Sequence, residues 1–189
     1  MVKTYFLGGN TAQGFYSLYD GFCSGPEDFL WVIKGGPGCG KSSFMRKIGK
    51  AAEEAGLDVE YVICSGDPDS LDGVYIPALH TGYVDGTSPH VVEVKLPAAG
   101  GAYLDLGQFY DTDALQPVRE QLLSLMQSYR QAYRDAYASL HEAKRLHDEL
   151  EAVYNPHVDF DGVYQLAEAH IARLKLKNLH CNSEENVVE

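Results

Sequence analysis

The sequence is poor in positive charge, lacks a long apolar run and has no paired cysteine motif. Its 15 Lys and Arg face 27 Asp and Glu, a formal net charge of −12, which argues against a non-specific nucleic-acid binder because such proteins need a basic face. Neither a signal peptide nor a run of about 18 apolar residues occurs, so we expect a cytoplasmic protein without a membrane span. The four cysteines form no C-x-x-C pair, which favours free thiols.

A glycine-rich segment organises the chain and fits the pattern G-x-x-x-x-G-K-[ST] of a phosphate-binding loop. It comprises Gly35, Gly36, Pro37, Gly38, Cys39, Gly40, Lys41 and Ser42. The apolar run at 29–34 predicts a buried strand before the loop, and apolar residues at helical spacing over 43–55 predict a helix that ends at Gly56. The motif therefore lies between a strand and a helix, where its mechanism requires it.

The residue types of this loop explain what it is expected to bind. Glycines let the backbone approach an anion closely, and N–H groups of the loop and of the helix start, up to Ser43, would point at phosphates. Lys41 would contact the β- and γ-phosphates, and the Ser42 hydroxyl would bind Mg²⁺. No Asn-Lys-x-Asp segment is present to read guanine. We therefore expect ATP and Mg²⁺ at residues 35–43.

Acidic residues follow the next two predicted strands, and parallel strands bring such positions to one sheet edge. Asp67 follows a strand at 58–64, in a loop that reads either as a polar turn or as a substrate site. A third strand at 79–84 ends at Asp85, which we expect to share the Mg²⁺ shell with Ser42, with Asp67 as the runner-up. Gly86 stands where many ATPases carry a Glu that activates water, which argues against a fast hydrolytic motor.

The segments on either side of this region give weaker patterns. Residues 3–7 predict a short strand, and residues 8–11 predict a turn that either is purely structural or lies near the nucleotide. Residues 91–96 alternate like a strand, and 97–101 form a small-residue loop.

In the C-terminal third of the sequence, apolar residues recur every three or four positions, which is typical of helices. A helix capped by Thr112 or Asp113 is expected to reach Tyr154, a length of roughly 60 Å. Asn-Pro-His at 155–157 breaks it, and a second helix over 160–179 completes an antiparallel hairpin. Arginines on this hairpin are solvated or supply an arginine finger. The fold class is then a three-layer α/β P-loop NTPase with a mostly parallel sheet at 1–111, a helical hairpin at 112–181 and a disordered tail at 182–189.

Several segments together resemble a bacterial family described as P-loop ATPases or nucleotide kinases. They are residues 8–11, 14–17, 34–42, 69–73 and 85–90. Members of that family have two P-loop halves in tandem, and this chain is similar to the N-terminal half as far as about Tyr154. The resemblance implies ATP binding without naming a phosphate acceptor.

The sequence leaves two main functions open. The first is ATP–Mg²⁺-dependent phosphoryl transfer, by a small-molecule or nucleotide kinase or a slow ATPase, in which Lys41, Asp67 and Asp85 are catalytic and Asp67 orients the acceptor as general base. The second is a nucleotide-dependent switch or assembly module whose hairpin binds a second copy, a missing tandem half or another protein. Nucleic-acid remodelling is disfavoured by the acidic composition.

Overall fold

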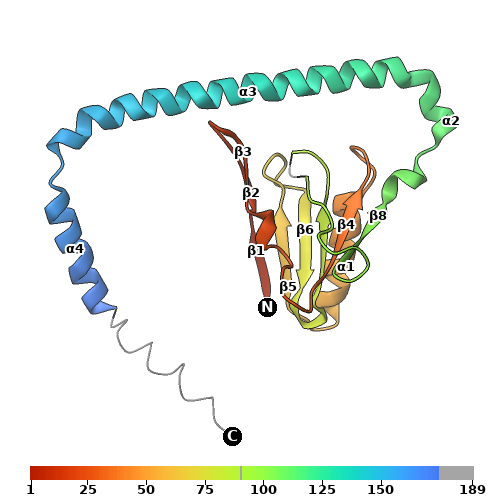
Figure 1. Cartoon of the computed structure of the whole chain (residues 1–189), viewed down its shortest axis with the longest axis horizontal. Coiled ribbons are helices and arrows are strands. Elements are labelled where there is room, and N and C mark those ends of the chain that lie inside the picture. Colours follow the sequence, from red (N-terminus) through yellow and green to blue (C-terminus); the bar gives the residue numbers. More distant parts are fainter. Residues whose placement is uncertain (90, 175–189) are drawn as a thin grey trace, which may run out of the picture. The chain divides into compact units, whose positions relative to one another are not determined.

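The computed structural model describes residues 1–89 and 91–174, and it contains a mixed α/β sheet domain and a long helix (Figure 1). Six strands form one sheet in the order β1-β5-β6-β7-β4-β8. Their bounds are β1 Val2–Tyr5, β4 Phe29–Lys34, β5 Val59–Ile63, β6 Leu71–Ile76, β7 Thr81–Asp85 and β8 Gly101–Asp105. Only β6 runs antiparallel to its neighbours, so the predicted mostly parallel sheet is confirmed.

A strand–helix–strand unit at the phosphate loop also forms as predicted. Strand β4 leads through the loop into α1 (Lys41–Glu54), and β5 follows. Strands β4 and β5 are parallel, although β7 and β6 lie between them. Helix α1 stops where Gly56 takes a positive φ of 77°, a conformation that glycine adopts without steric cost.

The order of the remaining strands differs from the sequence prediction. Residues 71–76 form β6, a strand that the sequence pattern did not predict. Gly101 begins β8 instead of ending a loop. The predicted strand at 91–96 is absent, because this extended stretch pairs with no strand among the described residues. Whether each of these three segments forms a strand depends on pairing with segments that are distant in the sequence. The alternation of apolar and polar residues within a segment does not reveal such pairing.

Apolar side chains form two core clusters, one on each face of the sheet. The first joins Ile33, Val59 and Val74 to Met45 and Ala52 of α1. The second cluster is covered by loops and short turns, with no long helix. Its members are Tyr19, Phe22, Val32, Val62 and Val84, and Val92 and Val94 pack against them. Tyr19 belongs to a short 3-10 turn, η1 (Tyr19–Gly21). Within the described residues, the expected three-layer arrangement is therefore helical on one face only.

A separate hairpin and several short turns connect these elements. Strands β2 (Gly8–Thr11) and β3 (Gly14–Ser17) pair antiparallel, where the sequence had predicted a turn at residues 8–11. The 3-10 turns η2 (Pro77–Leu79) and η3 (Leu106–Phe109) precede β7 and follow β8. The hairpin brings Asn10 to the loop after β5, where the Asn10 amide donates to the Ser65 carbonyl at 3.5 Å.

The C-terminal helical region begins with a break that the sequence prediction missed. Asp111, not Thr112 or Asp113, caps the short helix α2 (Thr112–Leu115) by accepting from the Ala114 N–H. A 3-10 turn with Pro117, η4 (Gln116–Val118), separates it from α3 (Arg119–Tyr154). Proline lacks the N–H that continues an α-helix, which explains the break.

Helix α3 ends at the predicted Asn-Pro-His segment, which forms η5 (Asn155–His157), and α4 (Phe160–Arg173) follows. The predicted continuation to 179 and the tail at 182–189 lie outside the described residues. No residue of α3 or α4 is buried, so the antiparallel packing of these helices stays a prediction.

The chain divides into two compact units, the first of which spans Met1–Ala143, and the second begins at Lys144 within α3. Across the described residues, none of the helices has the length and apolar character that crossing a membrane requires.

Candidate functional site

A cavity of about 470 Å³ lies where the phosphate loop and α1 meet the ends of β5 and β7 and the start of β6. The lining combines glycines of the loop, which expose their backbone, with the cationic side chains of Lys41 and Arg46 and several carboxylates. These residues are Gly38, Cys39, Gly40, Lys41, Ser42, Ser43, Arg46, Cys64, Asp67, Asp69, Ser70, Leu71, Asp72 and Asp85. The structure therefore brings together Lys41, Ser42, Asp67 and Asp85, which the sequence predicted as site residues.

The phosphate loop has the backbone conformation that its glycines permit. Gly38 and Gly40 have φ angles of 76° and 90°, in the left-handed region that side chains with a Cβ rarely adopt. Gly40 is the N-cap of α1, and no side chain caps this helix end. The first N–H groups of α1 are thus left to a ligand, and the positive end of the helix dipole favours an anion there.

Gly35, Gly36 and Pro37 form the first part of the loop, before the residues that line the cavity. A Cβ on Gly35 would come within 2.5 Å of the Cys39 sulfur, so this position has no room for a side chain. The Tyr110 hydroxyl donates to the Pro37 carbonyl at 2.9 Å. These three predicted binding residues are not among those that line the cavity, and their part in nucleotide binding stays a prediction.

Lys41 is held at the centre of the site by oxygen atoms on three sides. Its Nζ donates to the carbonyls of Gly35 and Gly36 at 2.9 and 3.1 Å, and it lies 3.6 Å from Asp85 Oδ2. The side chains of Lys41 and Asp85 are only 11% and 13% exposed, so little water screens this pair. Asp85 Oδ1 accepts from the N–H and hydroxyl of Thr87.

The Ser42 hydroxyl connects the loop to β6. Its oxygen accepts from the Leu71 N–H at 2.9 Å, which leaves one lone pair and the hydroxyl proton for another partner. Ser42 and Asp85 line the same cavity. Their shared role as magnesium ligands stays a prediction.

Asp72 is a site residue that the sequence prediction did not select. It is 4% exposed, which is unusual for a charged residue. The Tyr19 hydroxyl donates to its Oδ2 at 3.1 Å, and burial, reinforced by this carboxylate, raises the pKa of Tyr19 well above its usual range. Asp72 lies on β6, two positions after Ser70. The polar residues around it gave no indication in the sequence that its side chain is buried.

Asp67 lies at the exposed rim of the cavity and organises the loop after β5. Its carboxylate accepts from the Asp69 N–H at 3.2 Å and from the Ser70 hydroxyl at 2.6 Å. The Cys64 thiol lies nearby in the lining, and burial raises its pKa. Cys23, Cys39 and Cys64 are free thiols, as predicted, and Cys181 lies outside the described residues.

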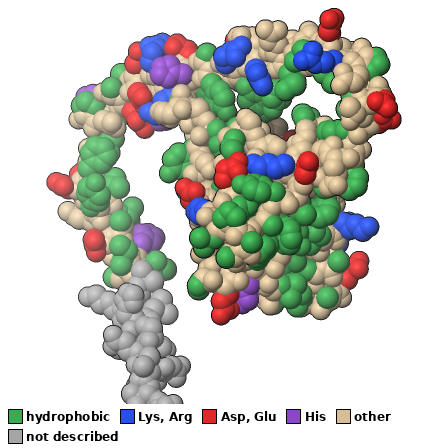
Figure 2. Space-filling model, turned by 45° about the vertical axis from the view of Figure 1, so that its right-hand side comes forward, with side chains coloured by type: hydrophobic (Ala, Val, Ile, Leu, Met, Phe, Trp, Pro, Cys, Tyr) green, Lys and Arg blue, Asp and Glu red, His purple; other side chains and the backbone are tan. Residues whose placement is uncertain are grey.

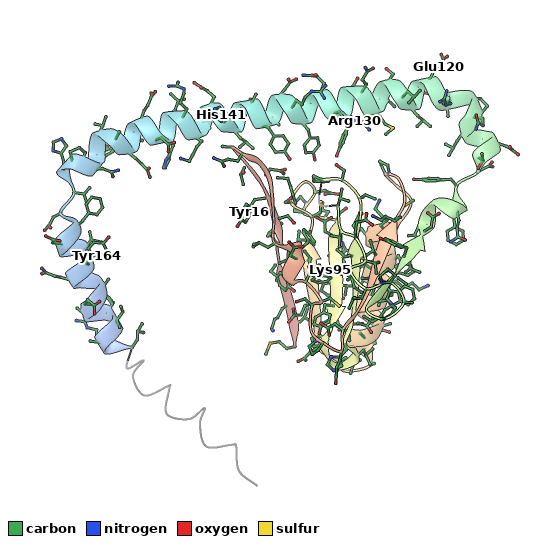
Figure 3. All side chains as sticks on the ribbon, in the orientation of Figure 1. Tyr16, Lys95, Glu120, Arg130, His141 and Tyr164 are labelled. Atoms are coloured by element: carbon green, nitrogen blue, oxygen red, sulfur yellow. The ribbon has the colours of Figure 1, made fainter. Side chains whose placement is uncertain are left out.

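Arg46 of α1 is the arginine that lines this cavity, and its guanidinium donates to the Asp69 carbonyl at 2.7 Å. Its spacing of four residues from Ser42, which places both on one face of the helix, was the available signal. No arginine of α3 or α4 lines the cavity in the described part of the chain. Arg130 lies on α3 and Tyr164 on α4 (Figure 3).

The donor set of this cavity fits a magnesium-bound polyphosphate. Carboxylate and hydroxyl oxygens are the ligands that Mg²⁺ prefers. A lysine, an arginine and an uncapped helix N-terminus provide three positive elements for phosphate oxygens. The arrangement suits phosphate binding at one side and acid–base chemistry at the Asp67 side.

Comparison of the chain with protein-family models, with curated proteins and with solved structures gave no match. The family resemblance of the sequence therefore stays a prediction, and a functional proposal depends on the geometry of the cavity.

Proposed function

We propose that this protein binds ATP–Mg²⁺ at the loop between β4 and α1 and transfers the γ-phosphoryl group, with the P-loop NTPase fold that this function implies. The observation that carries the proposal is the G-x-x-x-x-G-K-S segment between a strand and a helix, with Lys41, Ser42 and Asp85 in one cavity.

The chain offers a distinct group for each part of the bound nucleotide. Backbone N–H groups from Gly36 to Ser42, except at Pro37, which has none, would surround the phosphates. Lys41 would exchange its carbonyl partners for phosphate oxygens. Ser42 and Asp85 would hold Mg²⁺, which supplies neutralisation of the charge on the transferred group. Asp72 is an additional buried carboxylate beside Ser42 that would hold a water of the metal shell.

Asp67 is the group best placed to receive the acceptor proton. In the transfer, the acceptor oxygen forms a bond to the γ-phosphorus, and the bond from that phosphorus to the β–γ bridging oxygen breaks to release ADP. The acceptor proton passes to the Asp67 carboxylate and then to solvent, so Asp67 is regenerated. With water as the acceptor, the same steps yield free phosphate.

The test is a panel of small-molecule acceptors incubated with ATP and Mg²⁺, in which ADP and free phosphate are measured separately. Release of ADP without free phosphate identifies a kinase, and equal release identifies a hydrolase. Absence of ATP binding by calorimetry would overturn the proposal. ATP binding without release of either product would favour the second candidate below.

The second candidate is a nucleotide-dependent switch or assembly module, and the exposed apolar surface of the helices favours it. Leu122, Leu125 and Met126 of α3 are exposed, as are Val163 and Leu166 of α4, and Figure 2 shows hydrophobic side chains on the surface of this C-terminal region. Such surface commonly marks an interface. Light scattering with and without ATP–Mg²⁺ tests this candidate: a strictly monomeric chain at high micromolar concentration in both conditions would contradict it.

A further inference from the structure

A second cavity, of about 310 Å³, adjoins the phosphate-loop cavity at the ends of β5 and β7. Four residues line both cavities: Cys64, Asp67, Asp72 and Asp85. Asp85 is a proposed magnesium ligand, and the metal of such sites bridges the β- and γ-phosphates. The shared wall therefore adjoins the γ-phosphoryl end of a bound ATP, which is where a phosphoryl acceptor must lie.

The second cavity also has an aromatic wall, which comes from α3. Tyr129 and Tyr133 line it, with ring centroids 4.9 Å apart and ring planes tilted by 55°. Tyr137 continues the series, with its ring centroid 6.2 Å from that of Tyr133. A spacing of four residues places the three rings on one face of the helix. The cavity is therefore bounded by aromatic rings as well as by the carboxylates of the shared wall.

Contacts with the sheet domain hold this aromatic wall in place, within the first compact unit. The Tyr137 hydroxyl donates to Asn10 Oδ1 at 2.8 Å, and the Asn10 amide donates to the Ser65 carbonyl at 3.5 Å. The Tyr133 hydroxyl lies so close to Gly66 that a Cβ there would come within 2.9 Å of it. A ligand would therefore find the rings already positioned.

The ring of Tyr129 is accessible to a ligand. Tyr129 is 59% exposed although it lines the cavity, and its tilt relative to Tyr133 means that neither ring covers a full face of the other. Planar rings stack on such a face in an offset arrangement, and nucleobases do so whatever their identity. The volume of about 310 Å³ is near the lower limit for ligand pockets, which suits a small ring compound.

The polar groups of the second cavity favour an uncharged ligand with hydrogen-bonding edges. Asn10 lines the cavity, as do Thr87 and Ser88. A side-chain amide has two N–H donors and a carbonyl oxygen with two lone pairs, and it can pair with the donors and acceptors at the edge of a nucleobase. No lysine or arginine is among the described residues that line this cavity, so the lining offers no cationic side chain to a phosphate group.

We propose that the second cavity binds a nucleoside and that this nucleoside is the phosphoryl acceptor. Its base stacks on Tyr129 with an edge towards Asn10, and a sugar hydroxyl lies towards Asp67. The hydroxyl oxygen forms a bond to the γ-phosphorus as the bond to the β–γ bridging oxygen breaks, and the hydroxyl proton passes to Asp67. The products are ADP and a nucleoside monophosphate. The inference rests on the proposed function and names its acceptor class, which excludes a nucleotide as the acceptor.

The binding test is saturation-transfer NMR on the full chain, with a non-hydrolysable ATP analogue and Mg²⁺ present. The probes are adenosine, cytidine, uridine and thymidine, and ribose is the comparison because it has hydroxyls but no base. At least one nucleoside is expected to bind at least tenfold more tightly than ribose, since its base stacks on the ring. Binding of ribose as tight as that of every nucleoside would overturn the inference.

Two substitutions at Tyr129 test the stacking. Tyr129→Leu removes the ring and keeps an apolar side chain, so it is expected to weaken nucleoside binding about tenfold. Tyr129→Phe keeps the ring and is expected to stay within about twofold of the native affinity. Tyr164→Leu is the matched control, since Tyr164 is 67% exposed on α4 and lines neither cavity. Thermal melting checks that all three variants fold, and equal nucleoside affinities in the two Tyr129 variants would contradict the proposal.

Further outcomes separate this inference from the proposed function. Calorimetry with the ATP analogue and Mg²⁺ reports on the phosphate loop, and binding of the analogue without that of any nucleoside overturns the acceptor assignment only. Weaker binding of the analogue to Tyr129→Leu would show that the tyrosines hold the adenine of ATP, which also overturns that assignment. Tighter binding of AMP than of adenosine overturns it too, because the site would then accept a phosphate. Absence of analogue binding in the native chain overturns the proposed function itself.

Discussion

The central strands of the sheet and helix α3 differ in how much apolar surface they bury. Val32, Val62 and Val84 are completely buried between strands and covering chain, whereas no residue of α3 is buried. Both segments have regular apolar patterns in the sequence. A pattern fixes the type of secondary structure, but burial requires a partner surface, which the strands find in α1 and in the loops around Tyr19.

The largest expected effect compares two methionines, one from each region. Met45 of α1 is 0% exposed, and Met126 of α3 is 48% exposed. Met45→Ala should lower the free energy of unfolding by about 2–5 kcal/mol through lost burial and a cavity. Met126→Ala should change it by less than about 0.5 kcal/mol. Chemical denaturation measures both, and equal losses would show that α3 is packed against a surface in solution.

A smaller effect is expected at Asp28, whose side chain is 6% exposed beside β7. Burial alone would raise the pKa of Asp28, but hydrogen bonds from the Gly25 N–H, Tyr75 and His80 lower it below its ordinary value of 3.8. Asp28→Asn should therefore cost about 1.5–3 kcal/mol at pH 7, the range for hydrogen bonds to a charged group. Asp135→Asn on exposed α3 is the control and should cost less than about 0.5 kcal/mol.

The sign of the pH dependence at Asp28 follows from its lowered pKa. The folded state binds the proton less readily than the unfolded state, so the stabilisation is complete above about pH 3.8 and is lost as the pH falls through the folded-state pKa. The gap between the native chain and Asp28→Asn should shrink over that interval. A gap that widens on acidification would contradict the assignment.

The affinity for ATP–Mg²⁺ compares a lysine of the phosphate loop with a lysine on the exposed surface of α3. Lys41→Ala is expected to weaken ATP–Mg²⁺ binding at least tenfold, or about 1.4 kcal/mol, because a charge-assisted contact is deleted. Lys144→Ala, on the exposed surface of α3 and paired with Asp148, should leave the affinity unchanged in calorimetry. Equal affinities for Lys41→Ala and the native chain would remove the phosphate loop from the proposal.

The smallest expected effect concerns the attachment of α3. Tyr137→Phe removes the hydrogen bond to Asn10 and keeps the ring, which should cost about 0.5–1.5 kcal/mol. Amide exchange in residues 129–140 should accelerate, while exchange in β4 and β5 should stay slow. Tyr154→Phe, exposed at the end of α3, provides the control. Exchange unaltered by Tyr137→Phe would show that other contacts hold the helix.

The sequence predicted the elements that local patterns determine. The strand at 29–34, the loop, α1 and the strand at 59–63 agree with the structure because apolar runs, glycines and helical spacing all lie within short segments. The position of Asp85 at the end of a strand was predicted for the same reason, and its role as a magnesium ligand stays a prediction.

What the sequence missed depends on contacts between distant segments. Strand β6 is antiparallel between β5 and β7, and its Asp72 is buried by Tyr19 from 53 residues away. The hydrogen bond from the Tyr137 hydroxyl on α3 to Asn10 likewise joins residues 127 positions apart in the chain. The helical period identified α3, but only the folded chain relates one face of it to the strand ends.

The hydrogen bond from the Leu71 amide to the Ser42 hydroxyl gives the site an internal spectroscopic reporter. Any ligand that rotates the hydroxyl or withdraws its electron density changes the shielding of the Leu71 amide proton and its exchange with solvent. Leu71 is also the first residue of β6, a mostly buried strand. A change at the Ser42 hydroxyl would therefore alter the amide signal of a strand residue. If the loop binds ATP–Mg²⁺ as proposed, the Leu71 amide resonance would shift on binding, and NMR on a chain labelled at that amide would detect it.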